Sequence, residues 1–111
     1  MGTMLPVPLY SDIQRFLTYL SATGSNSPHT LRAYESDLKS FADFLGQRCN
    51  RPADTAMVTL ENARFWLGQM FGSCQKRTMA RRISALRSFS RWLSSSHGDS
   101  FDEMDQLGIP R

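Results

Sequence analysis

The segment Gln75–Ser95, QKRTMARRISALRSFSRWLSS, constrains the fold more than any other part of the sequence, because its apolar residues recur at the helical period. One side of the resulting helix collects Met79, Ile83, Leu86, Phe89 and Leu93. The opposite side carries Arg77, Arg81, Ser84, Ser88 and Arg91 at alternating four- and three-residue spacing. We therefore expect one long helix that packs on a small core and presents a polar, basic face.

The charge of this segment indicates the kind of partner it would meet. Six basic residues and no acid lie between Lys76 and Arg91, whereas residues 1–50 carry no net charge. A helix that only faces water usually mixes charges for pairing four residues apart, but Arg77 and Arg81 repel each other. Eleven of the thirteen basic residues are Arg, whose planar fork suits phosphates and guanine edges. The pattern favours a polyanion, with a solvated face as the alternative.

The remaining sequence predicts three further helices. The first runs from about Ser11, a plausible N-cap, to Ala22. The second follows the cap Ser27, with a proline in its first position, and ends before Gly46. The third runs from the cap Thr59 to about Phe71, after a loop over 47–58. No segment shows the alternation of a strand. We expect an all-α, orthogonal four-helix bundle with room for a short fifth helix at 101–107.

The chain of 111 residues is long enough for one domain with a modest core. Residues 1–8 contain two prolines and are predicted to form an irregular lead-in. Residues 9–98 are expected to form the helical domain. Residues 99–111 are expected to form an acidic tail and the start of an interdomain linker, with Phe101, Met104 and Leu107 as possible anchors.

Signals of catalysis are absent from the sequence. Cys49 and Cys74 fit no metal or redox spacing, and there is no Gly-rich phosphate loop, HExxH, CxxC or GxSxG. His29 and His97 have no neighbouring acid, and we expect the carboxylates to lie on polar helix faces. No apolar run is long enough to span a membrane, and because the first residues show no basic region followed by a hydrophobic one, we expect no secretory leader. We expect a cytoplasmic binding module without catalytic residues, metal or cofactor.

Two motifs carry a resemblance to a known family. The segments SPHTLRAYESDLKSFADFL at 27–45 and RTMARRISALRSFSRWL at 77–93 resemble two helices of the core-binding, SAM-like domain of tyrosine recombinases and phage integrases, Xer-type enzymes above all. The resemblance covers roughly residues 9–97. It implies that the second and fourth helices face the major groove of duplex DNA. It also implies two further partners, a C-terminal catalytic domain with a nucleophilic tyrosine and other protomers of a recombinase tetramer.

The resemblance assigns candidate DNA contacts on these two helices. On the second helix they are Thr30, Arg32, Ser36 and Lys39. On the fourth they are Lys76, Arg77, Arg81, Ser84, Arg87, Ser88 and Arg91. Arg82 lies beside the apolar stripe, so we expect a structural role, either pairing with a buried carboxylate or capping the C-terminus of another helix. Whether Arg77 or Arg81 reads a base or holds a phosphate is open.

The sequence also departs from the family pattern. It has no tyrosine in a suitable context for nucleophilic attack, and an acidic segment at 99–105 replaces the Asn-Pro pair that often follows the last helix. We therefore expect a truncated, non-catalytic part of a recombinase. Two alternatives remain. The first is an unrelated helical DNA-binding regulator, which is disfavoured because such a regulator joins its helices by a shorter turn. The second is a SAM-like protein-interaction module, for which exposed Phe65 and Trp92 would be the only hints.

Overall fold

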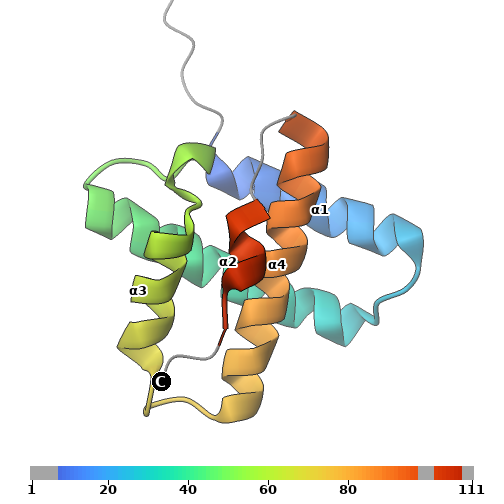
Figure 1. Ribbon diagram of the computed structural model, residues 1–111. Helices are drawn as coiled ribbons and strands as arrows, with labels where there is room; N and C mark the ends of the chain where they lie inside the picture. Colours follow the sequence, from blue (N-terminus) through green and yellow to red (C-terminus); the bar gives the residue numbers. More distant parts are fainter. Residues whose placement is uncertain (1–7, 98–101, 109–111) are drawn as a thin grey trace, which may run out of the picture.

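The computed structural model describes residues 8–97 and 102–108. Four helices account for most of them: α1 (Leu9–Thr23), α2 (Pro28–Cys49), α3 (Leu60–Met70) and α4 (Lys76–His97). Two short 3₁₀ helices, η1 (Thr55–Met57) and η2 (Asp102–Gln106), complete the fold, and the described residues contain no strand. Figure 1 shows α1 and α2 crossing behind α3 and α4 at a steep angle. The expected all-α bundle is confirmed.

The predicted N-caps of two helices are present in the structure. The Ser27 hydroxyl accepts the backbone N–H of Thr30 at 3.1 Å, and Pro28 occupies the first turn of α2, where a missing N–H costs nothing. The Thr59 hydroxyl accepts the backbone N–H of Asn62 at 3.1 Å and so caps α3. Both helices therefore begin where the local sequence indicates.

Helix α1 begins earlier than predicted. Its first residue is Leu9 rather than a residue after Ser11, and Pro8 in the cap position makes no side-chain cap bond. Leu9 is fully buried, and its backbone N–H bonds the carbonyl oxygen of Ala53 at 3.0 Å. Burial of Leu9 and this tertiary hydrogen bond replace the cap that Ser11 would have supplied.

Helix α2 extends past its predicted end. Gly46 stays helical, and the helix ends at Cys49, followed by Asn50 in the left-handed region with φ of 53°. Asparagine tolerates this conformation, and its backbone N–H bonds the carbonyl oxygen of Gly46. The predicted loop is consequently shorter, and it contains η1, whose first turn is capped by the Asp54 carboxylate.

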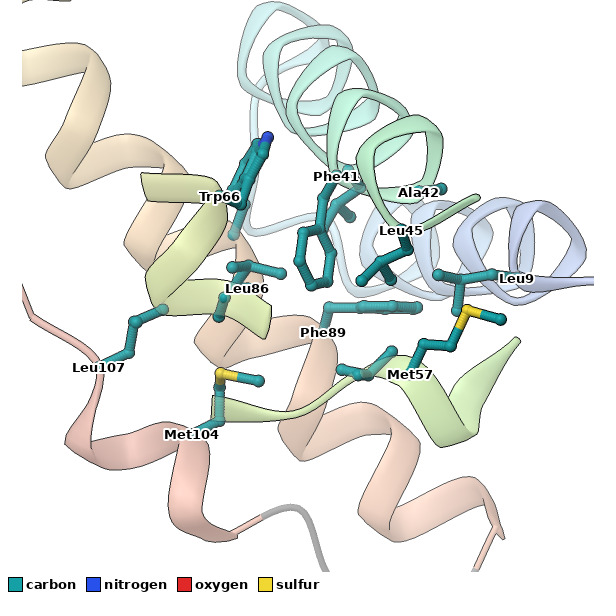
Figure 2. Close-up of a cluster of buried hydrophobic side chains, with 14 of the residues drawn as sticks. Leu9, Phe41, Ala42, Leu45, Met57, Trp66, Leu86, Phe89, Met104 and Leu107 are labelled. Atoms are coloured by element: carbon teal, nitrogen blue, oxygen red, sulfur yellow. The ribbon is translucent and has the colours of Figure 1, made fainter. Parts of the chain in front are cut away.

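The core lies between the helices and includes the whole predicted stripe of α4. Figure 2 shows Phe41 and Leu45 of α2 directed toward Leu86 and Phe89 of α4. The ring centroids of Phe41 and Trp66 lie 5.1 Å apart, at the distance of favourable aromatic pairs. The buried stripe of α4 consists of Met79, Ile83, Leu86, Phe89 and Leu93, as predicted.

The C-terminal segment η2 lies between α3 and α4 and belongs to the same core (Figures 1 and 2). Met104 and Leu107 are 1% and 3% exposed, which confirms them as the anchors of the predicted short helix. Phe101, residues 1–7 of the lead-in predicted over 1–8, and residues 109–111 lie outside the described residues. The boundary between residues 98 and 99 stays a prediction.

Three carboxylates are buried, contrary to our expectation that acids lie on polar faces. They are Asp12, Asp37 and Asp54. Each forms an ion pair with at least one arginine, because a buried charge is tolerated only when it is paired. In the described part of the chain, no helix is both long and apolar enough to cross a bilayer.

Candidate nucleic-acid interface

The polar face of α4 is accessible along its length. Lys76, Arg77, Ser84 and Arg91 are exposed, and Arg81, Arg87 and Ser88 are half-buried. The structure thus leaves all seven predicted positions of this helix within reach of a partner. Lys76 and Arg77 form no ion pair with the described residues, so both cations are available to an external anion.

The predicted face of α2 is also accessible, with one position committed to capping. Arg32, Ser36 and Lys39 are exposed and follow one another at four- and three-residue spacing. Thr30 is half-buried, and its hydroxyl shares a 3.0 Å hydrogen bond with that of Ser27. Thr30 therefore supports the start of α2, and its contact with DNA stays a prediction.

An ion pair joins the two helices. Arg81 of α4 donates Nε–H to Oδ2 of Asp37 at 2.7 Å and Nη2–H to Oδ1 at 2.8 Å, a bidentate arrangement. The Asp37 side chain is 1% exposed and that of Arg81 is 40% exposed. The hydrogen bonds to Asp37 raise the pKa of Arg81 above its ordinary value. The repulsion between Arg77 and Arg81 expected from sequence is thus moderated inside the protein.

Arg82 reaches the same carboxylate from the inner side of α4. Its Nε lies 3.2 Å from Oδ1 of Asp37, its Nη1 contacts the sulfur of Met70, and its guanidinium lies 5.2 Å from the ring centroid of Trp66. Its side chain is only 19% exposed. The predicted pairing of Arg82 with a buried carboxylate is confirmed.

Sequence reasoning missed Asp37 itself. A signal was available, because Asp37 lies three residues after Tyr34 and four before Phe41, and both belong to the apolar stripe of α2. A carboxylate at that edge of a helix points toward a neighbouring element. Its partner, 44 positions away, carries no sequence signal of proximity.

Two other predicted contacts already have acidic neighbours. Nζ of Lys39 lies 3.1 Å from Oε2 of Glu35, one helical turn away. Nη2 of Arg91 lies 3.4 Å from Oδ1 of Asp105 in η2. Hydrogen bonds from Gln14 and from Lys39 hold the pKa of Glu35 below its ordinary value. Both ion pairs are exposed, so they are weak and can exchange for a phosphate.

A cleft of about 610 Å³ continues the α4 face toward α1. Ser88 and Arg91 line it together with Tyr19, a residue that is 51% exposed. Trp92 lies in its wall, half-buried, with its ring 5.8 Å from that of Phe16. Trp92 therefore packs against the core. Tyr19 is an exposed aromatic residue of this cleft that sequence reasoning did not identify as a candidate contact.

A larger cleft of about 830 Å³ lies at α3, away from the α2 and α4 faces. Phe65 lines it and is 49% exposed, with the Arg48 guanidinium 4.0 Å from its ring centroid. Phe65 thus faces outward, as its place on the helix predicts. Within residues 8–97 and 102–108, no group of His, Cys, Asp and Glu has the arrangement of a metal site.

Comparison with known proteins identifies the family. Residues 13–97 match the model described as the phage integrase N-terminal SAM-like domain. The tyrosine recombinase XerC of Oceanobacillus iheyensis is 34% identical over 109 residues, 97% of this chain and 34% of the relative. Its counterparts in Pelobacter propionicus and Listeria innocua are 35% identical over 104 residues and 38% identical over 81 residues, covering 94% and 72% of this chain.

The chain spans about a third of the length of these relatives, 34% of the Pelobacter propionicus protein and 26% of the Listeria innocua protein. No solved structure matches the chain. A family match over most of the four-helix bundle, together with relatives above 30% identity, leaves no ambiguity about its ancestry. The chain belongs to the family of phage integrase N-terminal SAM-like domains.

Proposed function

We propose that this chain is the duplex-DNA-binding, N-terminal domain of a site-specific tyrosine recombinase. The observation that carries the proposal is the Asp37–Arg81 ion pair, because it joins two helices that each expose a stripe of cations and hydroxyls. A surface made of two such stripes suits the phosphates that flank a groove of duplex DNA. The names of the relatives, tyrosine recombinases, support the same reading.

Strand cleavage and rejoining belong, in this proposal, to a catalytic domain of the full protein. The chain spans 34% of the Oceanobacillus iheyensis relative and 26% of the Listeria innocua relative, so most of each relative lies outside the matched region. The catalytic domain and other protomers on DNA are the proposed protein partners. A DNA partner also fits the cytoplasmic location expected from sequence.

The first experiment is a salt titration of binding to a fluorescent 30-bp duplex drawn from a random-sequence pool. Roughly four phosphate contacts give a log–log slope of about −3.6. Arg77→Ala should reduce the slope by about 0.9, because one phosphate contact is lost. The matched control is Arg64→Ala, which removes the same charge from an exposed position of α3. Equal effects of the two variants, or binding without salt dependence, would contradict the proposed interface.

Sequence specificity requires a second experiment. Repeated selection from the random pool should enrich a duplex that binds at least about 10³-fold more tightly than the unselected pool. Backbone amide shifts on adding that duplex should concentrate in α2 and α4. Shifts confined to α1 and α3 would place the DNA on another face of the bundle.

One observation favours a second candidate function, protein interaction through α3. The cleft lined by Phe65 and Arg64 has a volume of about 830 Å³, and Phe65 is half exposed. This reading predicts self-association that Phe65→Ser abolishes without changing DNA affinity. Sedimentation of the isolated domain as a monomer at all concentrations would remove self-association as its role.

A further inference from the structure

We propose that Asp37 is a positioning residue for DNA binding, and that it fixes the guanidinium of Arg81 with its free donors directed at the nucleic acid. The inference rests on the proposed function and concerns the same surface. Asp37 is 1% exposed and cannot touch DNA itself, so it acts through Arg81.

The donors of Arg81 divide into two sets. A guanidinium has five N–H donors in a rigid plane. Asp37 takes the side-on pair, Nε–H and one Nη2–H, at 2.7 and 2.8 Å. Nη1 has no hydrogen-bond partner among the described residues. The end-on pair, one N–H from each Nη, therefore remains, and it matches two oxygens of a phosphate or the O6 and N7 of guanine.

The two arginines that share Asp37 have different exposures. Arg82 is 19% exposed and is held inward by Trp66 and Met70, whereas Arg81 is 40% exposed. One carboxylate between two guanidinium groups leaves one unit of positive charge, and the exposed member of the cluster carries it outward. The buried carboxylate is covered by both cations, so it presents no negative charge to the DNA backbone.

Fixing Arg81 in advance affects binding in a definite way. A free arginine side chain loses rotamer freedom when it contacts DNA, and this loss opposes binding. The bidentate ion pair has already removed that freedom in the free protein. Arg77 has no ion pair with the described residues and must be ordered by the DNA itself.

The substitution Asp37→Asn separates positioning from charge, because the two effects have opposite signs. It keeps the side-chain shape and raises the net charge by one unit, which favours DNA binding if only charge matters. If Asp37 positions Arg81, affinity for the selected duplex falls by about tenfold instead. The control is Asp54→Asn, which makes the same charge change at a buried acid paired with Arg51, outside α2 and α4.

A double-mutant cycle tests whether Asp37 acts through Arg81. Arg81→Lys keeps the charge and removes the planar fork, so it should also lower affinity. Adding Asp37→Asn to Arg81→Lys should then produce no further loss, because the group it positions is gone. Additive losses, or an Asp37→Asn domain that melts normally and binds as tightly as Asp54→Asn, would overturn the inference.

A measurement on the unmutated protein decides the matter if Asp37→Asn does not fold. The side-chain Nε–H signals of Arg81 and Arg82 are followed by nitrogen-15 NMR while the selected duplex is added. The Arg81 signal should shift and that of Arg82 should move little. An unmoved Arg81 signal, with backbone amides of α4 shifting, would overturn the role of Asp37 and leave the proposed function intact. If the unmutated domain binds no duplex, the proposed function itself fails.

Discussion

Leu60, the first residue of α3, donates its backbone N–H to Oε1 of Glu103 in η2 across 3.4 Å. The first N–H groups of a helix lack partners within the helix, and a carboxylate near them is favourable. The two residues are 43 positions apart, so this hydrogen bond joins the end of the described chain to its middle. Together with buried Met104 and Leu107, it makes η2 a part of the bundle.

We expect Met104→Ala to lower the free energy of unfolding by about 2–5 kcal/mol, because the side chain is 1% exposed and its removal leaves a cavity. Glu103→Gln, at an exposed position, should cost less than about 1 kcal/mol. Urea denaturation followed by circular dichroism measures both. A Met104→Ala domain as stable as the original would mean that the folded unit ends near the predicted boundary at residue 98.

Removal of the Asp37 carboxylate, which pairs with both Arg81 and Arg82, should lower the stability of the domain. We expect Asp37→Ala to destabilise the domain by about 3–5 kcal/mol, because Arg82, mostly buried, is left without its charge partner. Asp105→Ala breaks the exposed pair with Arg91 and should cost no more than about 1 kcal/mol. Thermal melts of the two variants test the contrast, and similar melting temperatures would argue that the Asp37 cluster adds little to stability.

Release of Lys39 should strengthen DNA binding. Glu35→Gln removes the ion pair at 3.1 Å, while the new amide oxygen can still accept the hydrogen bond from Gln14. We expect roughly two- to fivefold tighter binding at low salt, since Lys39 is then free to meet a phosphate. Anisotropy titration at two salt concentrations measures the change. Unaltered affinity at both would exclude Lys39 from the contact surface.

The same carboxylate makes a small contribution to the acid stability of the domain. Its folded-state pKa is lowered by hydrogen bonds from Gln14 and Lys39, so Glu35 stabilises the fold above its ordinary pKa of 4.5. That contribution is lost as the pH falls through the lowered value. The original domain should therefore melt slightly above Glu35→Gln at pH 7, and the difference should shrink as the pH falls below 4.5 and the carboxylate becomes protonated. A difference that grew in acid would contradict this assignment.

Much of the fold follows from local sequence. The stripe Met79, Ile83, Leu86, Phe89 and Leu93 is buried as its spacing predicts, because helical period alone places those residues on one side. Ser27 and Thr59 start their helices for an equally local reason, the hydrogen bond from a hydroxyl to an N–H three residues on. The exposure of the cations on α2 and α4 is also predicted by the helical period, which places them opposite the apolar stripes.

Tertiary structure decided the features that join distant residues. Helix α1 begins at Leu9, whose backbone N–H bonds the carbonyl oxygen of Ala53. Asp37 accepts hydrogen bonds from two arginines that lie 44 and 45 positions away in the sequence. Helical period says which face a residue occupies but not which element lies opposite that face. The sequence alone thus determined the four helices and their polar stripes. Only the packing of α2 on α4 decided that a buried carboxylate would hold Arg81. The physical reason is that burying the Asp37 carboxylate without a cationic partner would destabilise the fold.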